Sequence, residues 1–499
     1  ARSGQLTISA GKHALFAEAG GTNTVTGDGG MQIKGLESGL YALGSGSANT
    51  ITATGGGIAI EAANSNSYAM RAENKGVNTV IGTESVTLGG GKFGMHAAVD
   101  GQNSITGNGV DISATNNALY ANGSNGSNSK NIVDAGNGAA TLSADSAVSS
   151  FAGAQNIVTG ASVDIKGKTN GLFSSNAGSN NTVTTKADGA VFIAAGQRAM
   201  HVESGGSNKI ETVDGNVTVI GQGTGSAIGY GMSAMSGGSN TITTEGGHVS
   251  VSGSGDSGFG MVAKGGGVNA IESTINSPLT VTITASANTA EKAIAMWAEG
   301  GGSVNRITGH SQAGGTGDSI TLNANNGQGV AMQATNGGKN IITTGAGNDS
   351  VTINGKVVGD GNEIDLGGGS NTLTLNGAVQ PGSLNVVATG GTYTLILQES
   401  DVESFADRYG NWLDGIVTNN LFSGLSSIHF EGWDEGGQSA EELAEFMATF
   451  GDTLNTLHDA GVAIEPEALS DYLANPGPAA SPAALLVETG VEHHAQDAQ

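Results

Sequence analysis

The sequence contains no cysteine, only 6 prolines and few aromatic or charged side chains. Without cysteine the chain forms neither disulfide bonds nor thiolate metal sites, and it can cross an oxidising compartment without mispaired thiols. Aromatic residues make up 4% and charged residues 12% of the 499 residues. A core must therefore be built from many small aliphatic side chains. The 86 glycines are mixed with β-branched residues, which excludes collagen and plain disorder.

Positive charge is also scarce. The net charge of −26 argues against binding to nucleic acid or to anionic membranes. The imbalance is strongest in residues 399–499, which carry 19 acidic side chains and one basic one, Arg408. No apolar run is long enough to span a bilayer. The first residues, ARSGQLTISAG, do not form a signal sequence, so we expect an exported chain to be the processed form.

What the sequence does contain is a repeat. The phrase Asn-x-(Val/Ile) returns every 25 to 36 residues, which is the signature of a solenoid. Its asparagines are at positions 23, 49, 78, 103, 131, 156, 181, 208, 240, 269, 305 and 340. We expect this asparagine at a corner of each coil, with its amide bonded to corner backbone and to the asparagines above and below.

Two further phrases recur between these asparagines. One alternates as aliphatic-x-aliphatic, as in IAIEA at 58, and the other reads small-(Leu/Met)-x-small, as in YAMRA at 68. Short alternating runs separated by Gly, Asn and Ser predict three strands per coil. The first inward column predicted for these strands is Val25, Ile51, Val80, Ile105, Ile132, Ile157, Val183, Ile210, Ile242, Ile271, Ile307 and Ile341. The second is Leu15, Leu40, Met70, Met95, Leu119, Leu172, Met200, Met232, Met261, Met296 and Met332.

The predicted fold is all-β: a right-handed, three-sheet parallel β-helix of about 12–15 coils over residues 1–398, with shorter coils from 345. Residues 399–475 have helical spacing and predict an acidic, mainly helical cap or docking segment. Residues 476–499, which include NPGPAASPAA, predict a linker and a disordered tail.

These stacked phrases resemble the passenger domains of bacterial autotransporter adhesins. The resemblance implies a secreted or cell-surface rod without enzymatic activity, exported through the outer membrane from a precursor that carries a membrane β-barrel. It also implies binding to host or matrix ligands, either glycans or protein surfaces. Two other functions stay open: a polysaccharide lyase or hydrolase of β-helix type, and a subunit of a self-assembling filament or matrix.

A second, local resemblance lies at 345–352. GAGNDSVT resembles the calcium-binding nonapeptide of RTX proteins, and matching the motif residue by residue gives Gly345, Gly347 and Asp349 as calcium ligands. The neighbouring units depart from the motif, with Asn371 where an aspartate belongs. The alternative is a shortened ladder of β-turns that binds no metal. Calcium is the one cofactor that the sequence suggests.

A catalytic site of lyase type needs carboxylates that cluster on one sheet face. The middle-strand column offers only Asp111 and Asp164, two coils apart with Thr141 between them. His96 and His201 are four coils apart, roughly 19 Å, and cannot share a metal. We therefore predict no catalytic residues.

The variable residue of small-(Leu/Met)-x-small should face solvent. This outward column is Phe16, Tyr41, Arg71, His96, Tyr120, Phe151, Phe173, His201, Ser233, Val262, Trp297 and Gln333. Aromatic rings stacked ~4.8 Å apart suit the binding of sugar rings or of a partner. The predicted ligand-binding residues are Phe16, Tyr41, Tyr120, Phe173 and Trp297. The alternative is that aromatic side chains simply favour sheet surfaces.

Overall fold

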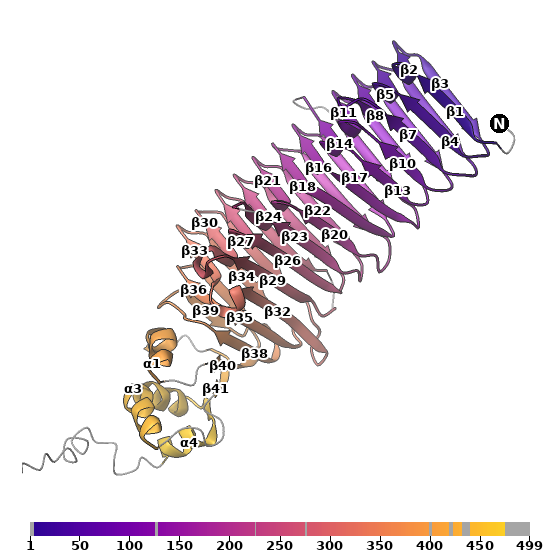
Figure 1. Cartoon of the computed structure of the whole chain (residues 1–499). Helices are drawn as coiled ribbons and strands as arrows, with labels where there is room; N and C mark the ends of the chain where they lie inside the picture. The colour runs from indigo at the N-terminus through magenta and orange to yellow at the C-terminus, as the bar shows by residue number, and fades with distance from the viewer. Residues whose placement is uncertain are drawn as a thin grey trace, which may run out of the picture.

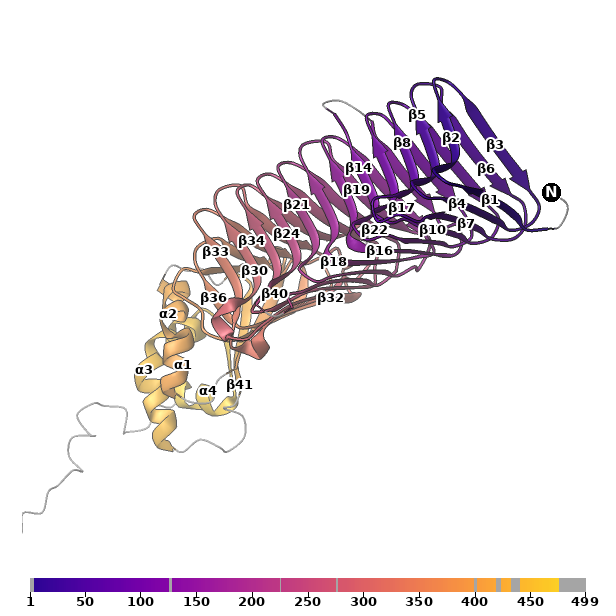
Figure 2. The same cartoon turned by 45° about the horizontal axis from the view of Figure 1, so that its top comes forward.

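The computed structural model describes residues 4–124, 128–224, 226–274, 277–398, 402–418, 423–431 and 440–474. The chain winds into a parallel β-solenoid of about fourteen turns, drawn as a long rod in Figure 1 and Figure 2. Nearly every turn contributes to each of three sheets, and like strands pair in parallel from turn to turn. This confirms the predicted all-β parallel solenoid.

Sheet 1 runs the length of the rod and continues into the cap. Its strands are β1 (Leu6–Ala10), β4 (Met31–Gly35), β7 (Ile58–Ala62), β10 (Val86–Gly89), β13 (Val110–Ser113), β16 (Ala139–Phe151), β18 (Ser162–Ser175), β20 (Val191–Ala195), β23 (Val217–Gln222), β26 (His248–Gly255), β29 (Thr280–Ala287), β32 (Thr316–Ala324), β35 (Asn348–Asn354), β38 (Gly369–Asn376), β40 (Gly391–Gln398), β41 (Leu425–Glu431) and β42 (Ala463–Glu465).

Sheet 2 follows sheet 1 in each turn. Its strands are β2 (His13–Glu18), β5 (Ser38–Leu43), β8 (Tyr68–Glu73), β11 (Phe93–Ala98), β14 (Asn117–Asn122), the second halves of β16 and β18, β21 (Arg198–Glu203), β24 (Ile228–Met235), β27 (Ser257–Lys264), β30 (Ala293–Glu299), β33 (Val330–Thr335) and β36 (Lys356–Val358). Because β16 and β18 pass through the corner without a break, they join sheets 1 and 2 into one hydrogen-bonded network.

Sheet 3 completes each turn and begins with the asparagine phrase. Its strands are β3 (Thr22–Gly27), β6 (Ala48–Ala53), β9 (Val77–Gly82), β12 (Gln102–Thr106), β15 (Lys130–Asp134), β17 (Gln155–Gly160), β19 (Asn180–Thr185), β22 (Ser207–Thr212), β25 (Ser239–Thr244), β28 (Val268–Ser273), β31 (Val304–Thr308), β34 (Lys339–Thr343), β37 (Asn362–Asp365) and β39 (Leu384–Val387). Two short 3-10 helices, η1 (Ala290–Lys292) and η2 (Asn325–Gly327), lie beside the longer coils.

The core is a stack of aliphatic columns. Ile51, Val80 and Ile105 are successive partners in sheet 3 and are fully buried, as predicted. The leucine and methionine column of sheet 2 is also fully buried from Leu40 to Met332. At the first turn, Leu15 and Val25 pack against the core but stay partly exposed.

Three residues of the predicted sheet 3 column face outward instead. They are Ile132, Ile157 and Ile341. Each directly follows a buried corner asparagine, and because successive side chains in a strand point to opposite faces, it faces outward. The buried positions belong to the residues after them, Val133, Val158 and Ile342. The prediction was wrong there because a shift of one residue moves a side chain to the opposite sheet face.

The corner asparagines form one unbroken hydrogen-bonded column, as predicted. Each donates from Nδ2 to Oδ1 of the asparagine in the next turn, at 2.8–3.0 Å, from Asn23 to Asn362. Between these ends the amides are almost completely buried. We call this column the asparagine ladder. Its links hold consecutive turns in register along the rod.

A small helical cap covers the last turn. It comprises α1 (Val402–Phe405), the π-helix η3 (Ala406–Gly410), α2 (Asn411–Thr418), α3 (Ala440–Asp459) and α4 (Glu467–Ala474). The Trp412 indole donates to the Leu384 carbonyl of β39, and the Tyr409 hydroxyl donates to the Leu375 carbonyl of β38. The cap thereby satisfies polar backbone groups at the open end of the sheets. The predicted tail, 476–499, lies outside the described residues.

None of the helices within the described residues is long and apolar enough to cross a membrane.

Candidate functional site

The five predicted ligand-binding residues lie in one column on the outer face of sheet 2. Phe16 pairs with Tyr41 of the next turn, and the column continues turn by turn to Trp297. Its members are Phe16, Tyr41, Arg71, His96, Tyr120, Ser149, Phe173, His201, Ser233, Val262, Trp297 and Gln333.

Ser149 occupies the place that the sequence assigned to Phe151. Because β16 runs straight through the corner, Val148 rather than Ser150 pairs with Leu119, and the register differs by two residues. The Phe151 ring nevertheless fills the gap that the small serine leaves. Its centroid lies 5.5 Å from the Tyr120 ring and 5.2 Å from the Phe173 ring.

A second outward column, which was not predicted from the sequence, lies three residues earlier in each strand. It contains His13, Ser38, Tyr68, Phe93, Asn117, Asn170, Arg198, Tyr230, Phe259, Ile294 and Val330. The signal was present in YAMRA, FGMHA, YGMSA and FGMVA, where an aromatic residue precedes the small one.

The two columns adjoin because each strand bends between them. In β8, Ala69 and Met70 are consecutive yet both belong to the core, so Tyr68 and Arg71 both face outward. The first of these inward positions must be small. A Cβ atom at Gly94 would collide with the Ile112 side chain and the Ala118 carbonyl oxygen.

Together the two columns form a row of rings that we call the aromatic ladder. The rings form three runs, His13 to Tyr41, Tyr68 to His201 and Tyr230 to Trp297. Within each run neighbouring centroids lie 5.1–5.5 Å apart, within the range of favourable ring contacts. In order along the rod the rings are His13, Phe16, Tyr41, Tyr68, Phe93, His96, Tyr120, Phe151, Phe173, His201, Tyr230, Phe259 and Trp297.

Arginine side chains lie at the two breaks in this row, between Tyr41 and Tyr68 and beside Tyr230. The Arg71 guanidinium lies 4.7 Å from the ring centroids of both Tyr41 and Tyr68, and Arg198 lies 6.0 Å from that of Tyr230. At the far end, the Lys264 ammonium lies 3.3 Å from the Trp297 ring. Cation–π attraction of this kind holds rings and cations in fixed positions.

The asparagine ladder fixes the backbone beneath the rings. Asn49 donates to the Tyr41 carbonyl at 2.8 Å, and Asn181 donates to the Phe173 carbonyl at 2.7 Å. Most strands of the aromatic ladder repeat this bond, including Asn131 to Tyr120. The surface is therefore rigid before any ligand arrives, which lowers the entropy lost on binding.

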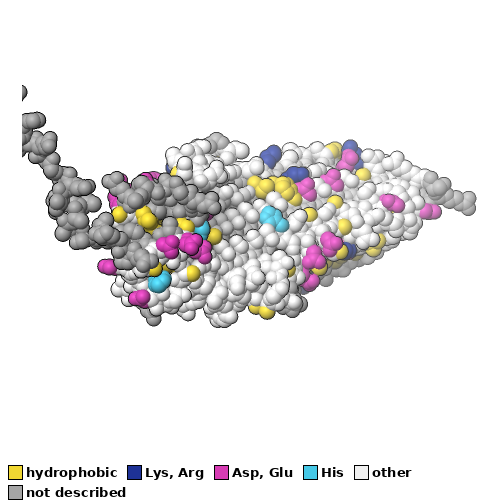
Figure 3. All heavy atoms as spheres, turned by 90° about the horizontal axis from the view of Figure 1, so that it is seen from below, with side chains coloured by type: hydrophobic (Ala, Val, Ile, Leu, Met, Phe, Trp, Pro, Cys, Tyr) yellow, Lys and Arg dark blue, Asp and Glu magenta, His cyan; other side chains and the backbone are white. Residues whose placement is uncertain are grey.

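Exposure varies along the aromatic ladder. Phe16 is 41% exposed, Tyr120, Phe173 and Trp297 are half-buried, and Tyr41 is 9% exposed. Tyr41 contributes less surface than a ligand-binding residue would. Figure 3 shows one face of the rod, on which charged side chains are sparse and hydrophobic ones gather in small groups.

Burial sets the charge of the aromatic ladder. It lowers the pKa of His96 and of His201 to about 4, so both rings are neutral at ordinary pH. It also raises the pKa of Tyr41 to about 12, with the Arg71 guanidinium opposing this rise. Glu73 balances Arg71 through an ion pair of 2.8 Å. The central rings therefore present an almost neutral surface.

Acidification is expected to destabilise the rod through His96 and His201. In the unfolded chain both bind protons near their ordinary pKa of 6.5, but in the fold only near 4. Their contribution is present in full above pH 6.5 and is lost as the pH falls toward 4, on the order of 3 kcal/mol per histidine. The urea midpoint measured across this range should fall.

The matched control is the double variant His96→Phe, His201→Phe, which keeps the rings stacked on Tyr120 and Phe173. Carboxylates titrate alike in both proteins, so their effect cancels in the comparison. The double variant should lose less stability than the wild type over the same pH range. An equal loss in the two proteins would show that the histidines do not sense pH.

Gly345, Gly347 and Asp349 lie together in a buried corner. The Gly345 N–H donates to Asp318 at 2.8 Å, and the Gly347 N–H donates to Ser311 at 3.0 Å. Asp349 accepts from the Ser311 hydroxyl at 2.7 Å, and burial raises the pKa of its carboxyl. These residues therefore form hydrogen bonds with residues of neighbouring turns, as expected for a shortened ladder of β-turns. Calcium binding stays a prediction.

The other candidate groups lie as the repeat predicted. Asp111 and Asp164 are separated by Thr141 in sheet 1, and Asp164 forms an ion pair with Lys166 at 2.6 Å. Within the described ranges, no three His, Cys, Asp or Glu side chains are grouped so as to hold a metal ion.

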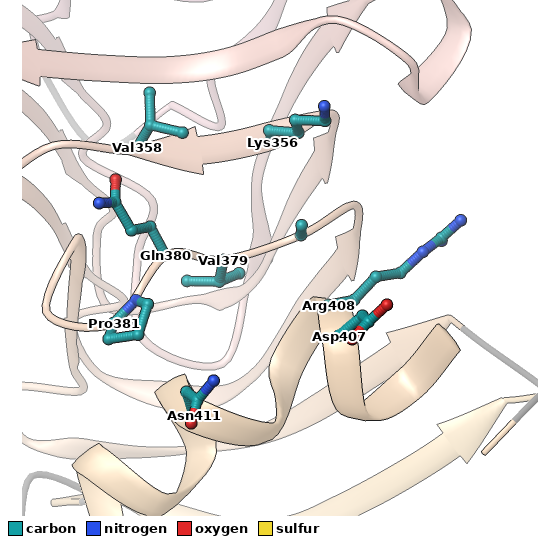
Figure 4. A pocket seen from close by; sticks show the side chains of 9 residues that line it. Lys356, Val358, Val379, Gln380, Pro381, Asp407, Arg408 and Asn411 are labelled. Atoms are coloured by element: carbon teal, nitrogen blue, oxygen red, sulfur yellow. The ribbon is translucent and has the colours of Figure 1, made fainter. Parts of the chain in front are cut away.

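One pocket, of about 210 Å³, lies where the last turns meet the cap. It is lined by Lys356, Val358, Ala378, Val379, Gln380, Pro381, Asp407, Arg408 and Asn411. Figure 4 shows the Lys356 and Arg408 side chains extending away from Val379 at its centre. This lining has one carboxylate, Asp407, and no histidine.

The chain matches no protein family, no curated protein and no solved structure.

Proposed function

We propose that the protein is a non-enzymatic binding rod that holds a neutral glycan chain along the aromatic ladder. The observation that carries the proposal is the row of rings that follows the rod axis from His13 to Trp297 in three runs, with neighbouring centroids 5.1–5.5 Å apart within each run. Pyranose rings present apolar C–H faces that stack on aromatic side chains. A polymer laid along the axis would meet a further ring at each step, so that weak contacts add up.

Charge supports a neutral ligand. The chain carries −26 overall and would repel an acidic polysaccharide at a distance. The ladder's histidines are neutral and Arg71 is paired with Glu73. The half-buried Tyr120 and Phe173 offer apolar ring surface that is fixed in place and costs little to desolvate.

The setting that we propose is the cell surface or the medium, with export across the outer membrane as the passenger of an autotransporter-type precursor. Two observations support it: the regular coil phrases and the absence of cysteine. The test is to read the precursor on both sides of this chain. A precursor without an export signal and a membrane barrel would contradict the setting without affecting the binding surface.

Removing the two rings on either side of Phe151 tests glycan binding. In the double variant Tyr120→Ala, Phe173→Ala the affinity for a neutral polysaccharide is expected to fall about tenfold or more, since each stacked ring contributes about 1 kcal/mol or more. Affinity is measured by electrophoresis through gels that contain neutral or acidic polysaccharides. The first step identifies the polysaccharide that retards the wild type.

The control is Phe192→Ala, which removes a half-buried ring from the outer face of sheet 1. It should bind as the wild type does. A second control, Tyr120→Phe, keeps the ring and should also bind normally. Unchanged binding in the double variant, or an equal loss in Phe192→Ala, would contradict the proposal.

A further inference from the structure

A second surface lies on sheet 1, where five consecutive strands present hydroxyl and amide side chains, with the His248 ring of β26 at one edge. The strands are β26, β29, β32, β35 and β38, which lie side by side in Figure 1. The outward residues, which we call the hydroxyl face, are Ser250, Ser252, Thr280, Thr282, Thr284, Ser319, Thr321, Asn323, Ser350, Thr352, Asn354, Thr372, Thr374 and Asn376.

The hydroxyl face is a regular grid. Thr282, Thr321, Thr352 and Thr374 are partners in successive strands, and the columns on either side keep the same register. Strand pairing spaces the groups ~4.8 Å apart along the rod, and alternate residues space them ~6.7 Å apart along each strand. The β-branched threonines hold their hydroxyl and methyl groups in few rotamers, so these groups repeat with the backbone.

The absence of charge sets this grid apart from much of the rod. The outward residues of β3, β6, β9 and β12 on sheet 3 are also uncharged, but they include aliphatic side chains. Elsewhere the outer faces carry ion pairs, such as Lys34 with Glu61 on sheet 1 and Lys209 with Glu211 on sheet 3. In a chain of net charge −26, fourteen neighbouring outward positions hold no charged group.

The hydroxyl groups of the grid are largely free to bind something else. Thr282 contacts the His248 ring at 3.2 Å. The side chains of Thr321, Thr352 and Thr374 have no hydrogen-bond partner among the described residues, and the Asn323 amide oxygen is buried without one. The threonine hydroxyl groups are therefore free to form hydrogen bonds with a ligand on the face.

The shape and chemistry argue against ordinary partners. Four strand gaps and two steps along each strand span only ~19 Å by ~13 Å, well below the ~800 Å² per partner of a stable protein interface. The face also lacks the aromatic and arginine anchors that supply most binding energy at interfaces. Apart from the His248 ring at its edge, it contains no aromatic side chain on which a sugar could stack.

The grid presents hydrogen-bonding groups at regular spacings both along the rod and along each strand. We propose that the hydroxyl face binds ice. Water held at each hydroxyl repeats at the interval of the strands, and the methyl groups between them exclude disordered water. Because the neighbouring turns lock the backbone, this water layer is ordered in advance and loses little further entropy when it joins a crystal.

Ice recrystallisation tests the proposal. The wild type should stop the coarsening of fine-grained ice, measured as the lowest protein concentration at which grain size stays constant. The double variant Thr321→Lys, Thr352→Lys places two strongly hydrated charges at the centre of the grid. It should need about tenfold more protein or more, the change expected when several hydrogen-bonded waters are displaced.

The matched control is Thr182→Lys, Thr241→Lys, which makes the same substitutions on the outer face of sheet 3 among existing charges. It should act as the wild type does. Urea midpoints of both double variants identify any loss of fold. A wild type without effect on ice, or an equal loss of effect in a folded control, would overturn the proposal.

This inference is separate from glycan binding. The variant Tyr120→Ala, Phe173→Ala should still stop coarsening, because its changes lie on sheet 2. If a single folded variant lost both glycan binding and the effect on ice, the claim that the two faces act independently would be contradicted.

Discussion

Replacing Asn156 by alanine is expected to destabilise the protein by about 3–6 kcal/mol, because it breaks three buried hydrogen bonds and strands their partners. The Asn156 amide donates to Asn181 and to the Ser149 carbonyl at 2.8 Å each, and its oxygen accepts from Asn131 at 2.9 Å. All of these groups are buried, so water cannot replace the lost partner. The effect is measured as a lowered urea midpoint.

Thr182→Ala is the control for this prediction. Thr182 lies in the neighbouring strand β19, faces outward and is half-buried. Its removal should cost within about 0.5 kcal/mol, as is usual for surface positions. If Asn156→Ala and Thr182→Ala shifted the midpoint equally, the asparagine ladder would not be what holds the turns in register.

Replacing Phe405 by alanine is expected to cost about 3–5 kcal/mol and to release the cap, because it empties the centre of the cap's core. The Phe405 ring is completely buried and contacts four other rings, at centroid distances of 5.0–5.4 Å. Those rings belong to Tyr409, Phe430, Phe446 and Phe450. Without the cap, the end strands of the solenoid lose their cover and can pair with other chains.

Light scattering after chromatography should therefore show soluble oligomers of Phe405→Ala that the wild type does not form. Phe405→Leu keeps an apolar side chain and should stay monodisperse with a smaller loss of stability. A monodisperse Phe405→Ala with an unchanged midpoint would show that the helices do not protect the end of the rod.

Repetition made most of the fold predictable. Each inward position recurs once per turn, so its assignment in one turn can be checked against the others, as for Leu40, Met70 and Met95. The prediction failed where the pattern has two solutions. In Asn-Ile-Val at 131 and 156, both residues after the asparagine are aliphatic, and only alternation from the buried asparagine selects Val133 and Val158.

The aromatic ladder was only half predictable for a different reason. The core column demands one kind of side chain, whereas the outward column of Tyr68 and Phe93 also holds serine, asparagine and arginine. Its adjacency to the other column depends on the bend at Ala69 and Met70, which strict alternation does not reveal. The position of Phe151 depends on an unbroken corner in β16, which no glycine or proline marks in the sequence.

The asparagine ladder also bears on how so long a molecule can fold. Its rungs join residues only 22 to 36 positions apart, from Asn340–Asn362 to Asn269–Asn305. The loop that must close for each rung therefore stays within this range at any point of the chain, and its entropic cost does not grow with the number of turns. Duplicating or deleting a turn therefore changes the length of the rod but does not change the cost of closing the loop in any other turn.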